Sequence, residues 1–280
     1  MIEIKNLSFK YGRKNFIFES LNMDFKAGNI YGLLGENGVG KTTLLRLMSG
    51  LLFPADGSIE ILGRVPKKRE PGFLEEVYYL PEVFNAPSFS LNKYVETYSM
   101  FYPRFDRKQF DNYVNELGVD PSKNISTMSY GQQKKALISF ALACNTSLLL
   151  LDEPTNGLDI PSKTVFRRLI AEFLEDYKCI IISTHQVRDL ENLIDPIVIL
   201  EYNQILLNNT IEEITSKLWF GIKPQKSQDA FYSEEALGGY FVVEPNTIEE
   251  ESKVNIEMLF NATVRNKKVF KEIFINNNIS

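Results

Sequence analysis

The sequence predicts an α/β fold, and three observations support this class. Near-continuous apolar runs at 148–151, 179–183 and 197–200 are separated by helix-length segments, as in strands of a parallel sheet that is covered on both faces. The strand expected at 29–34 leads directly into a glycine-rich turn and then into a helix with apolar residues at helical spacing. Short alternating segments precede this strand, so we expect an N-terminal antiparallel β layer beside the parallel core.

The β layer and a helical insertion follow from different patterns. Segments 2–9 and 16–25 alternate apolar and polar residues, as half-buried strands do. Between 81 and 129 the chain instead becomes rich in aromatic residues. We therefore predict an inserted helical subdomain at about 82–145, whose rings mainly pack its own interior.

The C-terminal part has another character. Beyond about residue 217 the sequence turns polar and irregular, with clusters of Ser, Asn and Lys, and one late helix is expected at 255–270. These features predict a small α+β extension at 217–280, which follows a main domain at 1–216. Regulation, dimerisation and simple covering of the core are open roles for this extension, and covering is favoured.

Composition and charge argue against several classes of protein. The 280 residues include 36 acidic and 31 basic side chains, a formal net charge of -5, and no long block of Lys or Arg could follow a phosphate backbone. We therefore expect no nucleic-acid partner. No apolar run approaches the roughly 20 residues that cross a bilayer, and the N-terminus lacks a secretory-signal pattern, so a cytoplasmic protein is expected. Cys144 and Cys179 lie in apolar stretches and are predicted to be buried thiols.

A phosphate-binding loop is the strongest single motif. Residues 35–42, Gly-Glu-Asn-Gly-Val-Gly-Lys-Thr, fit G-x-x-x-x-G-K-[ST] and stand between a strand and a helix, as this motif requires. In such a loop the backbone amides face phosphate oxygens, Lys41 reaches the β and γ phosphates, and the Thr42 hydroxyl ligates Mg²⁺. The alternative is a glycine-rich turn with a coincidental lysine. The predicted ATP contacts here are Gly35, Glu36, Asn37, Gly38, Val39, Gly40, Lys41, Thr42 and Thr43.

Two adjacent carboxylates follow a strand that is expected to be buried. Asp152 and Glu153 come directly after the leucine run at 148–151, at the edge where parallel strands form ligand sites. We expect Asp152 to hold Mg²⁺ through water, and Glu153 to orient and deprotonate the attacking water. A surface acidic turn is the alternative for a lone Asp-Glu pair, and the preceding leucines argue against it.

A second helix start lies between these two motifs. Ser129, Tyr130, Gly131 and Gln132 lead into a helix with one apolar face, and a helix N-terminus attracts anions. One triphosphate could use both sites only if it were clamped between two surfaces. With these motifs in this order, roughly residues 1–216 resemble the ABC ATPase family.

The resemblance implies roles for individual residues. Ser129, Gly131 and Gln132 match the signature motif, which contacts the ATP of the second subunit in a head-to-tail dimer. His185 matches the switch histidine that senses the γ-phosphate, and Tyr11 matches the aromatic residue that stacks on adenine. The catalytic residues that follow from the resemblance and the motifs are Lys41, Glu153 and His185.

Three further positions gain meaning from the resemblance. The Gly-Leu-Asp segment at 157–159 is similar to the loop that touches the opposite subunit. Glu82 stands where the family usually has a glutamine that ligates Mg²⁺ and links to the membrane partner, and Tyr130 stands where a glycine is usual. We expect Glu82 to join Thr42 and Asp152 as a Mg²⁺ ligand, and Tyr130 to fill extra space.

The function implied is that of an ATP-binding and ATP-hydrolysing subunit of an ABC transporter. It would bind ATP and Mg²⁺, close as a dimer with a second ATPase subunit, and power transport through an integral membrane permease at the inner face of the cell membrane. Export is favoured because the compact core with a short tail resembles bacterial exporter ATPases. Two alternatives are an ABC-type ATPase that acts on nucleic acid or ribosomes, and a small-molecule kinase. ABC-type ATPases that act on nucleic acid or ribosomes usually have two ATPase cores or a long coiled coil, whereas this sequence has one phosphate loop and no sustained heptad pattern. A small-molecule kinase would not explain the segment 129–132.

Overall fold

A six-stranded mixed sheet forms the centre of the computed structural model, which describes residues 1–12, 15–247 and 250–274. All neighbouring strands in it are parallel except the last pair, β8 and β9. The α/β class is therefore confirmed. In spatial order the strands are β5 (Val77–Leu80), β6 (Leu148–Asp152), β7 (Cys179–Thr184), β3 (Asn29–Leu34), β8 (Ile197–Glu201) and β9 (Gln204–Asn209).

The continuous apolar runs of these strands serve two separate cores. On β6, Leu149 and Leu151 pack into the core shared with the helices, whereas Leu148 and Leu150 pack into the core on the opposite face. Successive side chains of a strand point to opposite faces. A strand that is covered on both sides therefore needs apolar residues at every position.

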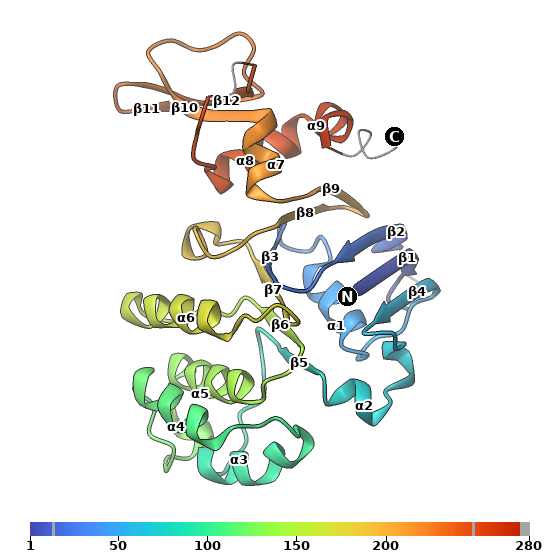
Figure 1. Ribbon diagram of the computed structural model, residues 1–280, viewed down its shortest axis with the longest axis vertical. Helices are drawn as coiled ribbons and strands as arrows, with labels where there is room; N and C mark the ends of the chain where they lie inside the picture. The colour runs from blue at the N-terminus through green and yellow to red at the C-terminus, as the bar shows by residue number, and fades with distance from the viewer. Residues whose placement is uncertain (13–14, 248–249, 275–280) are drawn as a thin grey trace.

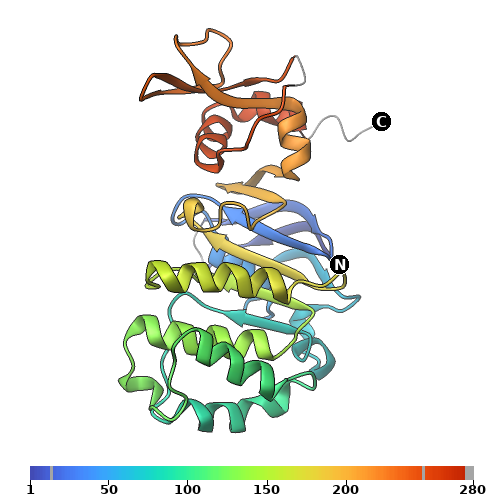
Figure 2. The ribbon, with the colours of Figure 1, turned by 60° about the vertical axis from the view of Figure 1, so that its left-hand side comes forward.

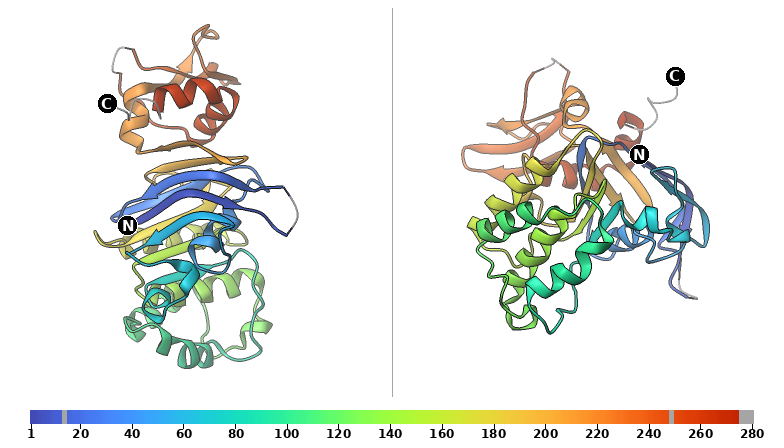
Figure 3. Two further views of the ribbon diagram at one scale, coloured as in Figure 1. Left: turned by 90° about the vertical axis from the view of Figure 1, so that its right-hand side faces the viewer. Right: turned by 60° about the horizontal axis from the view of Figure 1, so that its bottom comes forward.

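An antiparallel layer covers one face of the central sheet. Its strands lie in the order β2 (Phe18–Phe25), β1 (Ile2–Phe9) and β4 (Asp56–Ile61), and helix α1 (Lys41–Met48) belongs to the same core. Figure 3 (left) views the molecule from the side of this layer, with the C-terminal elements above it and the helical insertion below. The strand expected from Phe16 starts only at Phe18, because Phe16 is largely exposed.

The helical insertion lies at the bottom of Figure 1. It contains α3 (Leu91–Tyr98), α4 (Arg107–Glu116) and α5 (Tyr130–Ala143), while the short α2 (Pro71–Leu74) precedes β5. As expected, most of its rings pack inward, around the buried Phe110 and Phe140. The rings of Tyr98, Phe101 and Tyr130 remain exposed, as does the side chain of Met100.

The C-terminal elements pack on the other end of the molecule (Figures 1 and 2). Helix α6 (Ile160–Phe173) covers the central sheet. Helix α7 (Ile211–Lys217) leads into an antiparallel sheet in the order β10 (Leu218–Lys223), β12 (Gly239–Pro245) and β11 (Tyr232–Ala236). The hydrophobic core continues from the central sheet into this region. Two helices, α8 (Ile256–Arg265) and α9 (Lys267–Phe274), follow this sheet.

The prediction of a single late helix at 255–270 is wrong, because two helices, α8 and α9, occupy this region. The break falls at Asn266, whose backbone is not helical, with φ -120 and ψ 42. Its side-chain amide donates a hydrogen bond of 2.7 Å to the carbonyl of Phe231. The chain turns at this point, and Phe270 and Phe274 become buried.

Two further expectations concern the membrane and the thiols. Within the described residues, none of the helices has the length and apolar character needed to span a bilayer. Cys144 and Cys179 are both buried and free, as predicted.

Candidate functional site

The glycine-rich loop connects β3 to α1 by a tight path. Gly40, directly before the helix, has φ 111, and a Cβ atom there would lie 2.7 Å from the ring of Phe18. Only glycine adopts this backbone conformation without strain and leaves room for the ring. The first amides of α1 have no partner within the helix, so they form a concentrated donor site at the end of the loop.

Lys41 is the first residue of α1 and folds back over the loop. Its Nζ donates hydrogen bonds to the carbonyl oxygens of Gly35 (2.7 Å) and Glu36 (3.1 Å), and the side chain is almost fully buried. Burial lowers the pKa of the ammonium, while the carboxylates of Glu153 and Asp152 act in the opposite direction. Both carbonyl groups that accept from the Lys41 ammonium are neutral. A bound phosphate would therefore give this ammonium a negatively charged hydrogen-bond partner.

Asp152 ends β6 and is held by two hydroxyl groups. The Ser183 hydroxyl donates to its Oδ1, and the Tyr79 hydroxyl donates to its Oδ2 at 3.3 Å. Burial, followed by the charge of Asp152, raises the pKa of Tyr79 above its usual range, so this phenol stays protonated as a donor. The carboxylate is 1% exposed and its direction is fixed from two sides.

Glu153 follows immediately, with φ 45. One carboxylate oxygen, Oε1, accepts the backbone N–H of His185 at 3.0 Å and lies 2.7 Å from the His185 Nδ1. The other oxygen accepts the Thr184 hydroxyl at 3.2 Å. The two adjacent carboxylates thus have different hydrogen-bond partners, which fits different tasks for them.

These groups surround one cavity of about 470 Å³. It brings together most of the predicted site residues, although they come from five separate stretches of the chain. Ile17 also lines it and was not predicted. The predicted residues that line the cavity are Tyr11, Asn37, Gly38, Gly40, Lys41, Thr42, Thr43, Glu82, Asp152, Glu153 and His185.

The remaining predicted residues lie outside this cavity. Gly35 and Glu36 line the adjoining cavity, and the Val39 side chain is buried in the core. Ser129 caps α5 and, with Gln132, forms a reciprocal capping box at 3.3 Å for each hydrogen bond. Ser129, Gly131 and Gln132, which were expected to form the signature motif, therefore do not line the cavity beside the phosphate loop of their own chain.

Tyr11 lies at the outer edge of the cavity. Its hydroxyl is 3.2 Å from the Thr43 hydroxyl, and its ring meets Phe9 edge to face at 4.9 Å between centroids. Tyr11 is 38% exposed, so much of its ring remains accessible to a planar ligand. This arrangement fits the stacking role that was expected of it.

The donor set on the cavity wall fits magnesium. Thr42, Glu82 and Asp152 offer a hydroxyl and two carboxylates, which are hard oxygen ligands. Among the described residues there is no cluster of three or more His, Cys, Asp or Glu that could hold a metal alone. A Mg²⁺ ion here would need phosphate oxygens as further ligands, which is its usual mode in nucleotide sites.

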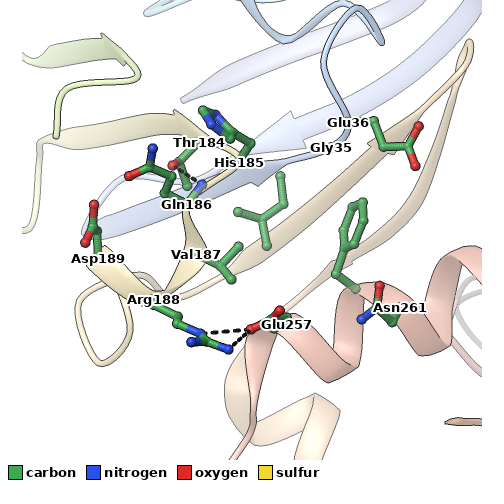
Figure 4. A pocket seen from close by; sticks show the side chains of 12 residues that line it. Gly35, Glu36, Thr184, His185, Gln186, Val187, Arg188, Asp189, Glu257 and Asn261 are labelled. Carbon is green, nitrogen blue, oxygen red and sulfur yellow. Dashed lines mark hydrogen bonds and ion pairs between the residues drawn. The ribbon is translucent and has the colours of Figure 1, made fainter. Parts of the chain in front are cut away.

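A second cavity, of about 540 Å³, lies behind the phosphate loop (Figure 4). One wall is the segment after His185, including the short 3₁₀ turn Val187–Asp189, and the opposite wall is helix α8. Across it, Arg188 donates to Glu257 Oε2 from Nε at 2.9 Å and lies 2.7 Å from it through Nη2. The C-terminal elements thus contact the segment that follows His185.

Several residues that shape the site were missed in the sequence. Ser183 and Thr184 hold the two carboxylates, and Tyr79 supports Asp152. The sequence did contain an indication of this role, because Ser183 and Thr184 are polar residues at the end of an apolar strand, directly before His185. The parallel pairing that places Ser183 opposite Asp152 was needed to use that signal.

A phosphate loop, a buried lysine and two carboxylates at the carboxyl edge of a parallel sheet define a P-loop nucleotide-binding site. The comparisons with known proteins agree. A family model described as ABC transporter matches residues 18–156, and the chain belongs to the family of ABC transporter ATP-binding proteins.

Individual relatives cover most of the chain. The uncharacterized ABC transporter ATP-binding protein MJ1023 of Methanocaldococcus jannaschii is 31% identical over 222 residues, which are 78% of this chain and 80% of that protein. The molybdate import ATP-binding protein MolC of Haemophilus influenzae is 29% identical over 239 residues, 83% of this chain and 92% of that protein. Among solved structures, the dimeric ATP-binding cassette MJ0796 bound to ADP and Pi superimposes with a TM-score of 0.66 at 21% identity and covers 75% of this chain and 98% of its own.

Proposed function

We propose that this chain is the ATP-hydrolysing subunit of an ABC transporter and drives transport through a separate membrane subunit. The observation that carries the proposal is the convergence of Lys41, Asp152, Glu153 and His185 on one cavity beside the phosphate loop. ATP would enter with adenine against Tyr11 and its phosphates over the start of α1. We assign this activity to residues 1–216 and treat 217–280 as the extension.

The residues divide the work on the phosphates. Lys41 would leave part of its contact with the loop carbonyls and pair with the β and γ phosphates. Thr42, Asp152 and Glu82 would hold Mg²⁺, which neutralises the charge that develops on the phosphate oxygens. Glu153 would orient the attacking water and accept its proton.

His185 has one ring nitrogen committed to Glu153. With Nδ1 at 2.7 Å from the Glu153 carboxylate, Nε2 remains to face the γ-phosphate. The contact with Glu153 would fix the direction of the ring, so that Nε2 could make a hydrogen bond with a γ-phosphate oxygen.

A second copy would complete the site. Ser129, Gly131 and Gln132 stand at the start of α5, where the helix dipole favours an anion, and they lie outside the cavity of their own chain. They reach a γ-phosphate if two chains meet head to tail, with the segment 157–159 of each copy against the other. ATP binding would then close the dimer, and hydrolysis would open it.

The membrane partner would be an integral permease that holds the subunit at the inner face of the membrane. The exposed Tyr98, Met100 and Phe101 of the helical insertion offer apolar contacts for it. We propose export as the direction, on the likeness of this compact core with a short tail to bacterial exporter ATPases. Since MolC serves import by its name, direction needs its own test.

The test is to identify and reconstitute the complex. The chain, expressed with an affinity tag in its own cell, should co-purify with a membrane protein of several apolar helices. In inverted vesicles, ATP added outside should drive the substrate inward if the complex is an exporter. Co-purification with ribosomes instead of a membrane protein would contradict the transporter assignment, and uptake only in right-side-out vesicles with internal ATP would contradict export.

A further inference from the structure

Glu82 is the meeting point of three segments. It follows β5 and lines the nucleotide cavity. Its backbone carbonyl accepts the Tyr130 hydroxyl at 2.6 Å and the Lys134 Nζ at 3.1 Å, both from the first turns of α5. Its side-chain Oε1 accepts the Asn156 amide at 3.0 Å, from the loop that follows β6. The start of α5 and the loop after the acidic pair are therefore joined through one residue.

The Tyr130 ring is closely fitted to its surroundings. It stacks on Phe84 with 5.9 Å between centroids and 14° between planes. Its other neighbour is Gly157, where a Cβ atom would lie 2.7 Å from the ring and where φ is 81. Both the space and the backbone at Gly157 therefore require glycine. Tyr130 does fill space, as expected, and its hydroxyl also makes a directed contact.

Lys134 donates to the same backbone carbonyl of Glu82 as Tyr130 does. Its side chain is fully buried, and Nζ lies 5.7 Å from the centre of the Tyr130 ring. Burial lowers the pKa of this ammonium to about 8, and Glu82 and Asp152 act against that shift. Burying a cation is costly unless it is well paired. The Glu82 carbonyl is one of the groups that compensate for this cost.

We propose that Tyr130 is a positioning residue for Glu82. Its hydroxyl fixes the Glu82 backbone, so that the carboxylate is held between Asn156 and the metal side of the nucleotide cavity. Any movement of the start of α5 is thereby transmitted to a metal ligand. The inference rests on the proposed function, in which Glu82 ligates Mg²⁺.

The geometry indicates what the contact does. Asn156 engages only Oε1 of the carboxylate, which leaves Oε2 to ligate an ion, as far as the described residues show. A phenylalanine at position 130 would keep the stacking on Phe84 and the packing on Gly157 but lose the bond to the Glu82 carbonyl. That substitution isolates the positioning effect from the filling of space.

The experiment measures metal binding rather than turnover. The full chain carrying Glu153→Gln is saturated with ATP and titrated with Mn²⁺, used in place of Mg²⁺ and followed by electron paramagnetic resonance. Tyr130→Phe should weaken Mn²⁺ binding by a factor of roughly 3 to 10, the equivalent of one hydrogen bond, while ATP binding without metal is unchanged. Tyr202→Phe, at an exposed tyrosine between β8 and β9, is the matched control and should have no effect.

Further variants test the metal site and the positioning role separately. Glu82→Ala should weaken Mn²⁺ binding at least as much as Tyr130→Phe, and Asn156→Ala should act in the same direction. In the double variant, Tyr130→Phe should add nothing to Glu82→Ala, because both act through one ligand.

Two results would overturn the claims separately. Unchanged Mn²⁺ affinity in Glu82→Ala would remove Glu82 from the proposed metal site. A clear loss in Glu82→Ala with none in Tyr130→Phe, or an additive double variant, would leave the metal site intact and refute the positioning role of Tyr130.

Discussion

Replacing Glu153 by glutamine tests the proposed chemistry with little change in shape. An amide keeps an oxygen that can accept from the His185 backbone N–H, now 3.0 Å from Oε1. The amide nitrogen can face the Thr184 hydroxyl, which lies 3.2 Å from Oε2 and is able to accept. Since both contacts have a replacement, the cost to folding should stay below about 1.5 kcal/mol.

The loss of rate should be far larger than the loss of stability. A positioned general base contributes a factor of about 100 to 10,000, which corresponds to about 2.7 to 5.4 kcal/mol in the barrier. An amide cannot accept the proton of the attacking water. Glu153→Gln should therefore lose at least about 99% of its ATPase rate, yet bind ATP as the unchanged chain does.

The assay combines phosphate release with equilibrium binding of labelled ATP. Size-exclusion chromatography with light scattering should show that the Glu153→Gln variant accumulates as a closed dimer when ATP and Mg²⁺ are present. Glu60→Gln, at an exposed position of β4, is the matched control and should hydrolyse normally. Undiminished turnover in Glu153→Gln would refute the assignment of Glu153 to the water.

Three further predictions concern the loop, the signature and the core. Lys41→Ala should weaken ATP binding by a factor of roughly 10 to 150, the value of a charge-assisted hydrogen bond, and an unaltered dissociation constant in calorimetry would contradict the loop assignment. Ser129→Ala removes both a helix cap and a signature contact. Ser129→Ala and the cap control Ser90→Ala should each lose about 1 kcal/mol of stability. Only Ser129→Ala should also lose ATP hydrolysis, while its monomer still binds ATP. Equal ATPase activity in the two variants would count against the signature role of Ser129. Burial raises the pKa of Cys179 to about 12 and that of Cys144 still higher, so a thiol reagent at pH 8 should label neither in the folded chain and both in denaturant.

Motifs that are contiguous in sequence could be predicted well. The loop at 35–42, the pair Asp152 and Glu153, and His185 each follow an apolar strand, and the ends of parallel strands meet at one edge of a sheet. That local rule predicts that they lie at the same edge, and they line one cavity because β6, β7 and β3 are neighbours in the sheet. The α/β class follows from the same apolar runs.

Contacts between distant segments could not be predicted in this way. The Tyr130 hydroxyl meets Glu82 across 48 positions of sequence, and this contact depends on how α5 lies against the segment after β5. The break at Asn266 depends on the carbonyl of Phe231, which only the folded extension brings near. Hydrophobic periodicity predicts which face of a single helix or strand is buried. It does not predict which other segment packs against that face, and both contacts depend on this.

We expect one ATP to be shared by two copies of the chain, and a structure of the Glu153→Gln variant with ATP and Mg²⁺ is the strongest test of this sharing. The γ-phosphate should contact Lys41 of one copy and the start of α5, at Ser129, of the other. A dimer or monomer in which ATP is bound by the loop while Ser129 faces only solvent in every copy would contradict it.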